Sequence, residues 1–446
     1  HAELEIARDI QRAMLPAAPQ PDGVRLALRT HACLEPAKIV GGDFYHFLPA
    51  GPGRLWFLIG DVSDKGVPAA LFMARSMTVL EVASRGQHGP DQVLSAASLR
   101  LADLGADVIK VERPDGGDLS RRLYVSNLRI DGDSTLFHTI NRNKRSLAAD
   151  LKNPDDMARL RTLLKTADVM IQNFRPGVME RLGLGYEDVR TINPALVYAS
   201  VSGYGDAGPW RGKPGQDLLV QAMSGLAWMS GNASEPPVAT GVAVADMMTG
   251  THLVQGILAA LVRRGVSGRG GRIDVSLMES ILDLQFEFFS TFLNDGEKAP
   301  VRGSIGSASA YLSAPYGIYP TRDGFLAIAM NPIDKLAGLI EAPELEPYHA
   351  PATWFDGRDE IKAIISRHIA TRSTAEWLAV LEPADIWCAP VMSWPELVSH
   401  EGFKSLGMVQ QVSTNTGATL RTTRCPIRVD GRILTSGRRS EEHTSE

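Results

Sequence analysis

The chain of 446 residues has little cysteine, no long hydrophobic run and no excess of basic residues. Its three cysteines, Cys33, Cys388 and Cys425, are too few and too scattered for a disulfide framework or a zinc site, which favours a reducing, cytoplasmic setting. The apolar run over residues 253–262 is far shorter than the ~20 residues of a membrane span. A net charge of −5 predicts no broad basic surface, so neither a membrane nor a nucleic acid is an expected partner.

A secretory signal is also missing from the opening residues, and the first residue is His1 rather than Met. We therefore expect the natural start to lie further upstream. The length favours about three domains, or two large ones. Ordinary hydrophobic and charged fractions of 44% and 22% indicate a globular chain with ample material for a core.

Residues 1–94 have the pattern of a partial α/β domain. The stretch "AELEIARDIQRAMLP" has helical spacing and stops at Pro16. A Gly-Gly pair precedes Asp43 and a strand, and "LWFLIGDVSDKGVPAALFMA" predicts a strand, a turn and a helix from about Pro68. Asp43 and Asp61 would then lie at strand ends, where two carboxylates can bind magnesium or manganese and activate water. The alternative is structural, because Asp also favours turns.

These motifs together resemble the sporulation-type serine/threonine phosphatases of the metal-dependent PPM class. The resemblance implies part of a PPM α/β sandwich, with Asp43 and Asp61 as metal ligands and the Val62 carbonyl assisting. The family needs further aspartates from later motifs, which are not found after Leu94. We expect no phosphatase activity, and magnesium or manganese binding only if the domain were complete.

After residue 94 the pattern changes to strands that alternate with helices. Buried strands are predicted in "DVIKVE" and "DVMIQNF", a strand followed by a polar turn in "NRNKRSLAADLKNP", and a strand that ends in a Gly turn in "ALVYASVSGYG". Helices are predicted in "DDMARLRTLLKTA" and "YEDVRTIN". This alternation predicts a doubly wound parallel sheet, which binds ligands beyond the carboxyl ends of its strands. Arg113, Asn173 and Phe174 stand at those ends. "LGLG" (residues 182–185) does not follow a strand and lacks the spacing of a dinucleotide loop.

This second part resembles the class III CoA-transferases, the family of formyl-CoA transferase. The matching motifs run in order and include "LADLGADVIKVERP", "NRNKRSLAADLK", "VMIQNFRPGVMERLGL", "SVSGYGDAGPW" and "PPVATGVAVADMMTG". The resemblance implies a large domain over residues 95–300, a smaller α+β domain over 301–401 and a segment over 402–438 that returns to the large domain. Residues 439–446 resemble a translated sequencing adapter and are expected to be a non-native tail without structure.

Asp246 is the candidate nucleophile. It enters the predicted helix that contains "LVQGILAAL", where the helix N-terminus favours an ionised carboxylate and apolar neighbours can exclude water. The alternative is a plain N-cap Asp. The resemblance implies that Asp246 attacks an acyl-CoA thioester, and that CoA then passes to a carboxylic acid through aspartyl anhydride and aspartyl-CoA thioester intermediates. It implies no metal or redox cofactor.

The resemblance also implies the residues that contact coenzyme A, which is a substrate here. Arg113, Lys152 and Arg181 would contact the nucleotide, with Ala149, Leu151, Asn173 and Phe174 beside the adenine and pantetheine; each cation taken alone also fits a solvated surface residue. Related racemases on this fold pair the aspartate with a histidine. The matching position here is Gln216, which cannot transfer a proton, so racemisation is the less favoured alternative.

The join between the two parts lacks the opening strand that the transferase family places before "LADLG". A natural fusion keeps both cores intact, so we interpret the chain as a chimera of two genes rather than a functional fusion. The resemblance further implies an interlocked homodimer, in which each chain threads through its partner. The expected small-molecule partners are an acyl-CoA and a small carboxylic acid.

Overall fold

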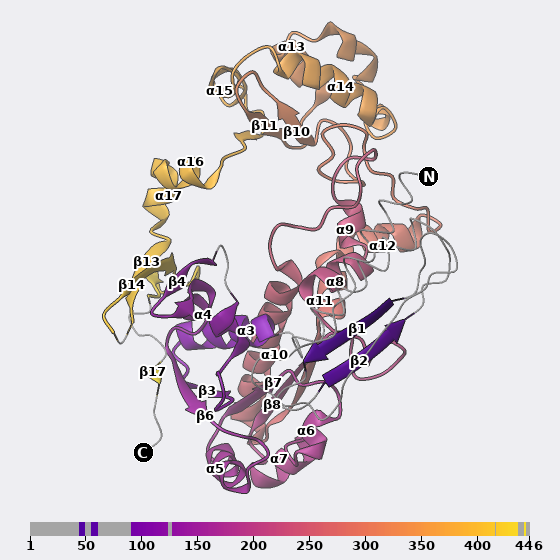
Figure 1. The fold of residues 1–446 in the computed structure, drawn as a ribbon. Coiled ribbons are helices and arrows are strands. Elements are labelled where there is room, and N and C mark those ends of the chain that lie inside the picture. Colours follow the sequence, from indigo (N-terminus) through magenta and orange to yellow (C-terminus); the bar gives the residue numbers. More distant parts are fainter. Residues whose placement is uncertain are drawn as a thin grey trace. The chain divides into compact units, whose positions relative to one another are not determined.

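The computed structural model describes residues 44–49, 55–60, 91–123, 127–414, 416–435 and 441–442. The chain divides into two compact units, residues 1–88 and 89–446 (Figure 1). In the first unit, β1 (Phe44–Pro49) and β2 (Leu55–Gly60) form an antiparallel pair with Phe44 opposite Gly60. Both strands were predicted. The candidate metal ligands Asp43, Asp61 and Val62 lie outside the described residues, so the phosphatase-like site stays a prediction.

The second unit begins with helix α3 (Asp91–Asp103) and strand β3 (Val108–Glu112). β3 pairs in parallel with β6 (Lys144–Ala148), as the alternating pattern predicted. The other edge of β6 pairs with β17 (Glu441–Glu442), which belongs to the tail. The expectation of a tail without structure is therefore wrong at these two residues, because strand pairing depends on backbone groups that every sequence supplies.

A second parallel sheet has the order β7-β8-β9, formed by Val169–Gln172, Val197–Ser202 and Gly271–Ser276. Alternate residues of β8 face opposite sides. Val197, Ala199 and Val201 pack against α10 (Val244–Ser267) and α11 (Leu277–Leu284). Tyr198 packs on the other side with Val189 of α7 (Tyr186–Ile192). Helices on both faces confirm the doubly wound fold class, although the parallel strands form two sheets.

Helices α3 and α5 (Pro154–Leu164) join the two sheets into one domain. On one face, Met157 and Leu160 of α5 share a core cluster with Leu147 of β6 and Met170 of β7. On the other, α3 contacts β3 and contributes Val93 and Ala97 to the cluster beside β7 and β8. α3 runs without a break across the expected boundary between residues 94 and 95. Val93, which precedes that boundary, is fully buried in the core of the transferase part.

The short elements of the large domain connect these layers. They are η1 (Leu119–Arg122), β4 (Arg129–Ile130), β5 (Asp133–Ser134), α4 (Thr135–Ile140), α6 (Val178–Arg181), α8 (Asp217–Met223), α9 (Leu226–Met229) and α12 (Phe286–Asn294). Among the described residues, no helix is both long and apolar enough to cross a membrane.

The smaller domain is α+β, as expected. Its antiparallel sheet β10-β11-β12 comprises Gly317–Pro320, Phe325–Ile328 and Cys388–Pro390. Figure 1 shows α13, α14 and α15 gathered beside this sheet. Its core includes the fully buried Tyr319, Leu326 and Ile365, with Trp377 almost as deeply buried. The remaining elements are α13 (Ile333–Leu339), η3 (Pro343–Tyr348), η4 (Pro351–Thr353), α14 (Arg358–Ile369) and α15 (Thr374–Leu381).

The chain then runs from the smaller domain back to the large one. Thr416, in the turn between two antiparallel strands, donates a hydrogen bond to Asp131 of the large domain at 2.5 Å. The elements of this segment are α16 (Trp394–Ser399), α17 (Glu401–Leu406), β13 (Val409–Ser413), β14 (Thr419–Thr423), β15 (Arg428–Val429) and β16 (Arg432–Ile433).

Candidate active site

Asp246 is the third residue of α10 and is 6% exposed. The N-cap of that helix is Ala243, which has no side chain to accept a hydrogen bond. The N-cap interpretation of Asp246 is therefore wrong. Four residues further on, Gly250 faces α3 so closely that an added Cβ would stand 3.2 Å from the Cβ of Ala96. This close contact fixes the first turns of α10 against α3.

The cap of α10 comes from a different helix. Asp217, the first residue of α8, accepts hydrogen bonds from the backbone N–H groups of Ala245 at 2.7 Å and Asp246 at 3.1 Å. A carboxylate suits this place, because the first N–H groups of a helix have no partner within the helix and carry partial positive charge. Asp217 was missed at the sequence level, because it lies far from Asp246 along the chain.

Gln221 holds Asp217 from behind. Its Nε2 donates to Asp217 Oδ2 at 2.6 Å and to the Val242 carbonyl at 3.3 Å. Its Oε1 accepts from the backbone N–H of Thr240 at 2.9 Å and from the Thr240 hydroxyl at 3.1 Å. Gln221 is 1% exposed, so this network joins α8, the loop before α10 and the helix start that carries Asp246.

Gln216 is the exposed N-cap residue of α8 and directly precedes Asp217. The structure therefore brings the backbone of Gln216 next to the residue that caps the helix of Asp246. The role of Gln216 as the counterpart of a racemase histidine stays a prediction.

Four of the candidate CoA-contacting residues follow the ends of three parallel strands. Leu151 and Lys152 lie in the turn after β6, and Arg181 is the last residue of α6. Arg113 follows β3 and Ala149 follows β6, and these two ends are joined by the Ala149 N–H, which donates to the Glu112 carbonyl at 2.9 Å. Asn173 and Phe174 follow β7, where the Phe174 N–H donates to the Gln172 side chain at 2.8 Å.

Burial divides these candidates into two groups. Ala149 is buried in the cluster under α5, and Leu151 packs on its edge. The exposed candidates are Arg113, Lys152, Phe174 and Arg181. Exposed cations and one exposed aromatic ring beside strand ends are suited to contact phosphates and a base, and burial of Ala149 makes it part of the supporting core.

An ion-pair network that the sequence patterns did not predict anchors the loop after Arg113. Arg121 Nε lies 3.0 Å from Glu112 Oε2, and Lys110 Nζ lies 2.5 Å from Asp118 Oδ2. The Asp118 N–H also donates to Glu112 at 2.8 Å. Burial raises the pKa of Glu112, but the hydrogen bond from Arg121 and the charge of Lys110 outweigh it, so the pKa of this carboxyl lies below its usual value.

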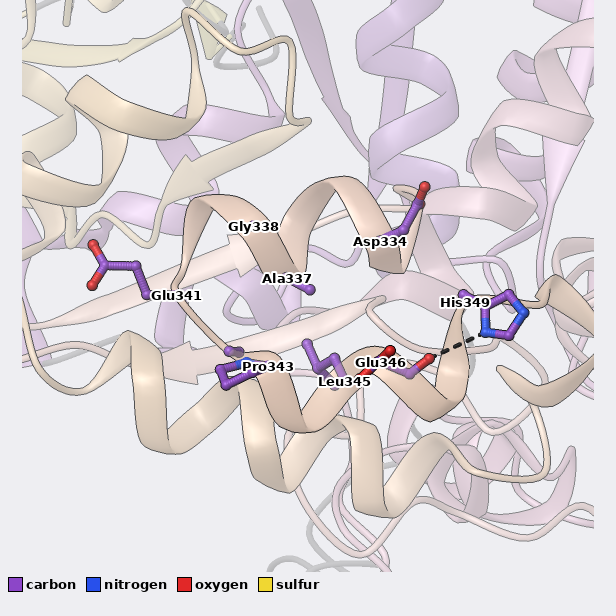
Figure 2. A pocket seen from close by; sticks show the side chains of 9 residues that line it. Asp334, Ala337, Gly338, Glu341, Pro343, Leu345, Glu346 and His349 are labelled. Atoms are coloured by element: carbon purple, nitrogen blue, oxygen red, sulfur yellow. Dashed lines mark hydrogen bonds between the residues drawn. The ribbon is translucent and has the colours of Figure 1, made fainter.

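The pocket drawn in Figure 2 lies in the smaller domain, between α13 and η3. Its acidic side chains do not converge: Figure 2 shows Asp334 and Glu341 pointing in different directions. His349 is hydrogen-bonded to the Glu346 carbonyl at 3.1 Å. None of the residues that surround Asp246 line this pocket, and no group of three metal-binding side chains occurs among the described residues.

Comparison with known families decides the class of the protein. The sequence profile described as CoA-transferase family III matches residues 92–440. This chain belongs to CoA-transferase family III. A second profile, that of stage II sporulation protein E, matches residues 51–114 of this family III CoA-transferase. The two matches overlap at residues 92–114, which hold α3 and β3, and both resemblances found in the sequence are thereby confirmed.

Several curated relatives of this family III CoA-transferase are named for succinate, glutarate or oxalate. The chain is 34% identical over 343 residues to a succinate–glutarate CoA-transferase of Agrobacterium fabrum, covering 74% of this chain and 84% of the relative. It is 33% identical to the succinyl-CoA:glutarate CoA-transferase of Mus musculus, covering 71% and 73%. A formyl-CoA:oxalate CoA-transferase of Rhodopseudomonas palustris is 31% identical, with 74% and 82% covered.

Solved structures support the same class. A CAIB/BAIF family protein from Brucella suis has a TM-score of 0.68 at 29% identity, covering 78% of this chain and 92% of that protein. A protein from Mycobacterium tuberculosis has a TM-score of 0.66 at 27% identity, with 79% and 92% covered. The α/β fold and the CoA-transferase activity class predicted from the sequence are confirmed.

Proposed function

We propose that this CoA-transferase works through Asp246, which moves CoA from an acyl-CoA donor to a small carboxylic acid. The observation that carries the proposal is the position of Asp246, 6% exposed in the first turn of α10 and held there by the Asp217 and Gln221 network. A carboxylate that is fixed and largely shielded from water is suited to nucleophilic attack on a thioester.

The reaction balances in four steps on this carboxylate. A carboxylate oxygen of Asp246 attacks the acyl carbonyl of the donor, which forms a mixed anhydride and expels the CoA thiolate. The thiolate attacks the aspartyl carbonyl, which gives an aspartyl-CoA thioester and releases the donor acid. The acceptor carboxylate attacks that thioester and expels the thiolate again. The thiolate then attacks the acceptor carbonyl of the second anhydride, which yields the new acyl-CoA and regenerates Asp246.

Exposed cations provide the proposed CoA contacts. Arg113 and Arg181 would pair with phosphate oxygens, and Lys152 would add a third positive charge. Phe174, which is 43% exposed, offers a ring face for the adenine or pantetheine. Leu151 and Asn173 complete this contact surface, with the buried Ala149 supporting it from below.

The acceptor that we propose is a short dicarboxylic acid. Relatives with 31–34% identity are named for succinate, glutarate and oxalate, which share two carboxylates on a short chain. Gln216 argues against the racemase alternative, because an amide side chain does not exchange protons near neutral pH. We further propose that the phosphatase-like segment has no phosphatase activity and that the protein acts in the cytoplasm.

An interlocked homodimer is the proposed assembly. α12 has no buried residue, although it carries large apolar side chains: Phe286, Phe289 and Leu293 are 64%, 43% and 53% exposed. An apolar helix face left open to water in one chain indicates a surface that a partner covers. A second copy of the chain is the partner that the family resemblance implies.

The test is a mass-spectrometric screen of acyl-CoA and dicarboxylic acid pairs with the full chain, followed by Asp246→Asn. The variant should lose CoA exchange while it keeps the fold, because an amide cannot form the anhydride. Hydroxylamine should label Asp246 during turnover of the parent. The matched control is Asp283→Asn on neighbouring α11, where the carboxylate is exposed and lies 3.3 Å from His252. Substantial exchange by Asp246→Asn would rule out the covalent mechanism.

A further inference from the structure

The start of α10 depends on a residue that the helix itself does not supply. Its N-cap, Ala243, offers no side-chain acceptor. Two of the N–H groups in its first turn, those of Ala245 and Asp246, both donate to Asp217 Oδ1. One of these two groups belongs to the proposed nucleophile itself, so Asp217 holds the backbone of Asp246 directly.

We propose that Asp217 is a positioning residue that fixes Asp246 for attack on the thioester. This inference rests on the proposed role of Asp246. Asp217 acts through the backbone: it defines where the first turn of α10 begins and therefore where the Asp246 side chain stands. A displacement of about 1 Å in a reacting group can cost about 100-fold in rate, so such a constraint has a measurable effect.

Asp217 has a second consequence for the chemistry. A carboxylate that accepts backbone N–H bonds is stabilised in its charged form and becomes a weaker nucleophile. The two N–H donors at the start of α10 are directed to Asp217. One carboxylate thus satisfies the helix terminus, and the other serves the reaction.

The Asp217 side chain is itself held in place by a hydrogen bond from Gln221. Gln221 contacts both Asp217 and the Val242 carbonyl through one amide nitrogen. Thr240 closes the network, because its hydroxyl donates towards Gln221 Oε1 at 3.1 Å and towards the Val242 carbonyl at 3.0 Å. Gln221 therefore links Asp217 to the loop before α10 through hydrogen bonds.

The experiment compares Asp217→Leu and Asp217→Asn in the full chain. Asp217→Leu removes the acceptor and should lower kcat by about 10–100-fold, with KM for the acyl-CoA changed less than about threefold. Asp217→Asn keeps an oxygen for both N–H groups but replaces the acceptor for Gln221 Nε2 with an NH2 group, so it should recover part of that loss. The control is Asp188→Leu, which removes a comparable 3.1 Å bond to the Gly185 N–H at the start of α7 and should leave kcat unchanged.

Two results would overturn the inference: an Asn variant as slow as the Leu variant, or a Leu variant no slower than the Asp188 control. Thr240→Val covers the case in which Asp217→Leu fails to fold. Thr240 is exposed and valine has the same shape, so folding is preserved while the hydroxyl proton that Gln221 Oε1 and the Val242 carbonyl share is lost. We expect a fall in kcat of about threefold with KM unchanged, and an unchanged kcat would contradict the network.

A separate measurement distinguishes failure of this inference from failure of the proposed function. If the parent chain exchanges no CoA with any acid, the proposed function is contradicted, and kcat can no longer be compared between the Asp217 variants and the control. The rate at which an isoxazolium reagent modifies Asp246, followed by peptide mapping, still tests positioning. Asp217→Leu should raise that rate several-fold over the Asp188→Leu control by loosening the first turn, and equal rates would refute the inference.

Discussion

Replacement of Asp103 by alanine should destabilise the second unit strongly. Asp103, the last residue of α3, accepts two hydrogen bonds from the Arg142 guanidinium, at 3.2 Å to Nε and 2.9 Å to Nη2. Both side chains are only 2% exposed. Asp103→Ala leaves a buried positive charge without its carboxylate, which costs about 3–5 kcal/mol of unfolding free energy. For a unit as long as residues 89–446 that corresponds to a melting temperature about 4–7 °C lower.

The assay is urea and thermal unfolding of the full chain, followed by tryptophan fluorescence. The matched control is Asp107→Ala, because Asp107 pairs with Arg145 at a site where both side chains are well exposed, and it should cost less than about 1 kcal/mol. A double variant with Asp103→Leu and Arg142→Met removes both charges and should regain most of the loss. A cost below about 1 kcal/mol for Asp103→Ala would refute the claim that α3 is an integral part of the transferase fold.

Three further outcomes are expected. Lys362→Met should add about 1–3 kcal/mol to the unfolding free energy, because the buried Nζ of Lys362 has no hydrogen-bond partner among the described residues. Burial lowers the pKa of Lys362 in the folded protein below its ordinary value of 10.5, so parental stability should rise as the pH approaches that value from below. A series of urea unfolding curves at increasing pH should show that this slope is lost in the variant. Arg181→Gln should raise KM for the acyl-CoA about tenfold with little change in kcat, and an unchanged KM in steady-state assays would remove Arg181 from the CoA site. Phe289→Glu on α12 should shift the chain from dimer to monomer in light scattering, and an intact dimer would place the interface elsewhere.

The strands and the α/β class could be predicted from the sequence because they depend on local patterns. The apolar run that precedes Arg113 forms β3, and the one that precedes Asn173 forms β7, so both residues occur at carboxyl ends as expected. Alternating strands and helices then limit the sheet to parallel pairing. The CoA-contacting positions proposed at strand ends follow from this logic, and their contacts with CoA stay predictions.

The details around Asp246 could not be predicted in the same way. An Asp just before an apolar helical run fits an N-cap and a third helical position equally well, and only the three-dimensional start of α10 separates them. The true cap, Asp217, comes from another helix, and its partner Gln221 reads as an ordinary helical residue. Contacts between residues far apart in sequence leave no periodic signal.

The division of the parallel strands into two sheets has a consequence for backbone dynamics. Among the described strands, β3 pairs only with β6, and β7 pairs only with β8, whereas β8 has a neighbour on each side. Ile109 and Val111 of β3 are 38% and 44% exposed, while Val197 and Ala199 of β8 are fully buried. Amide hydrogen exchange should therefore be slowest along β8 and much faster along β3 and β7. Protection would then follow the number of paired edges, so β8, with a partner on each side, should outlast β3 and β7, which have one described partner each.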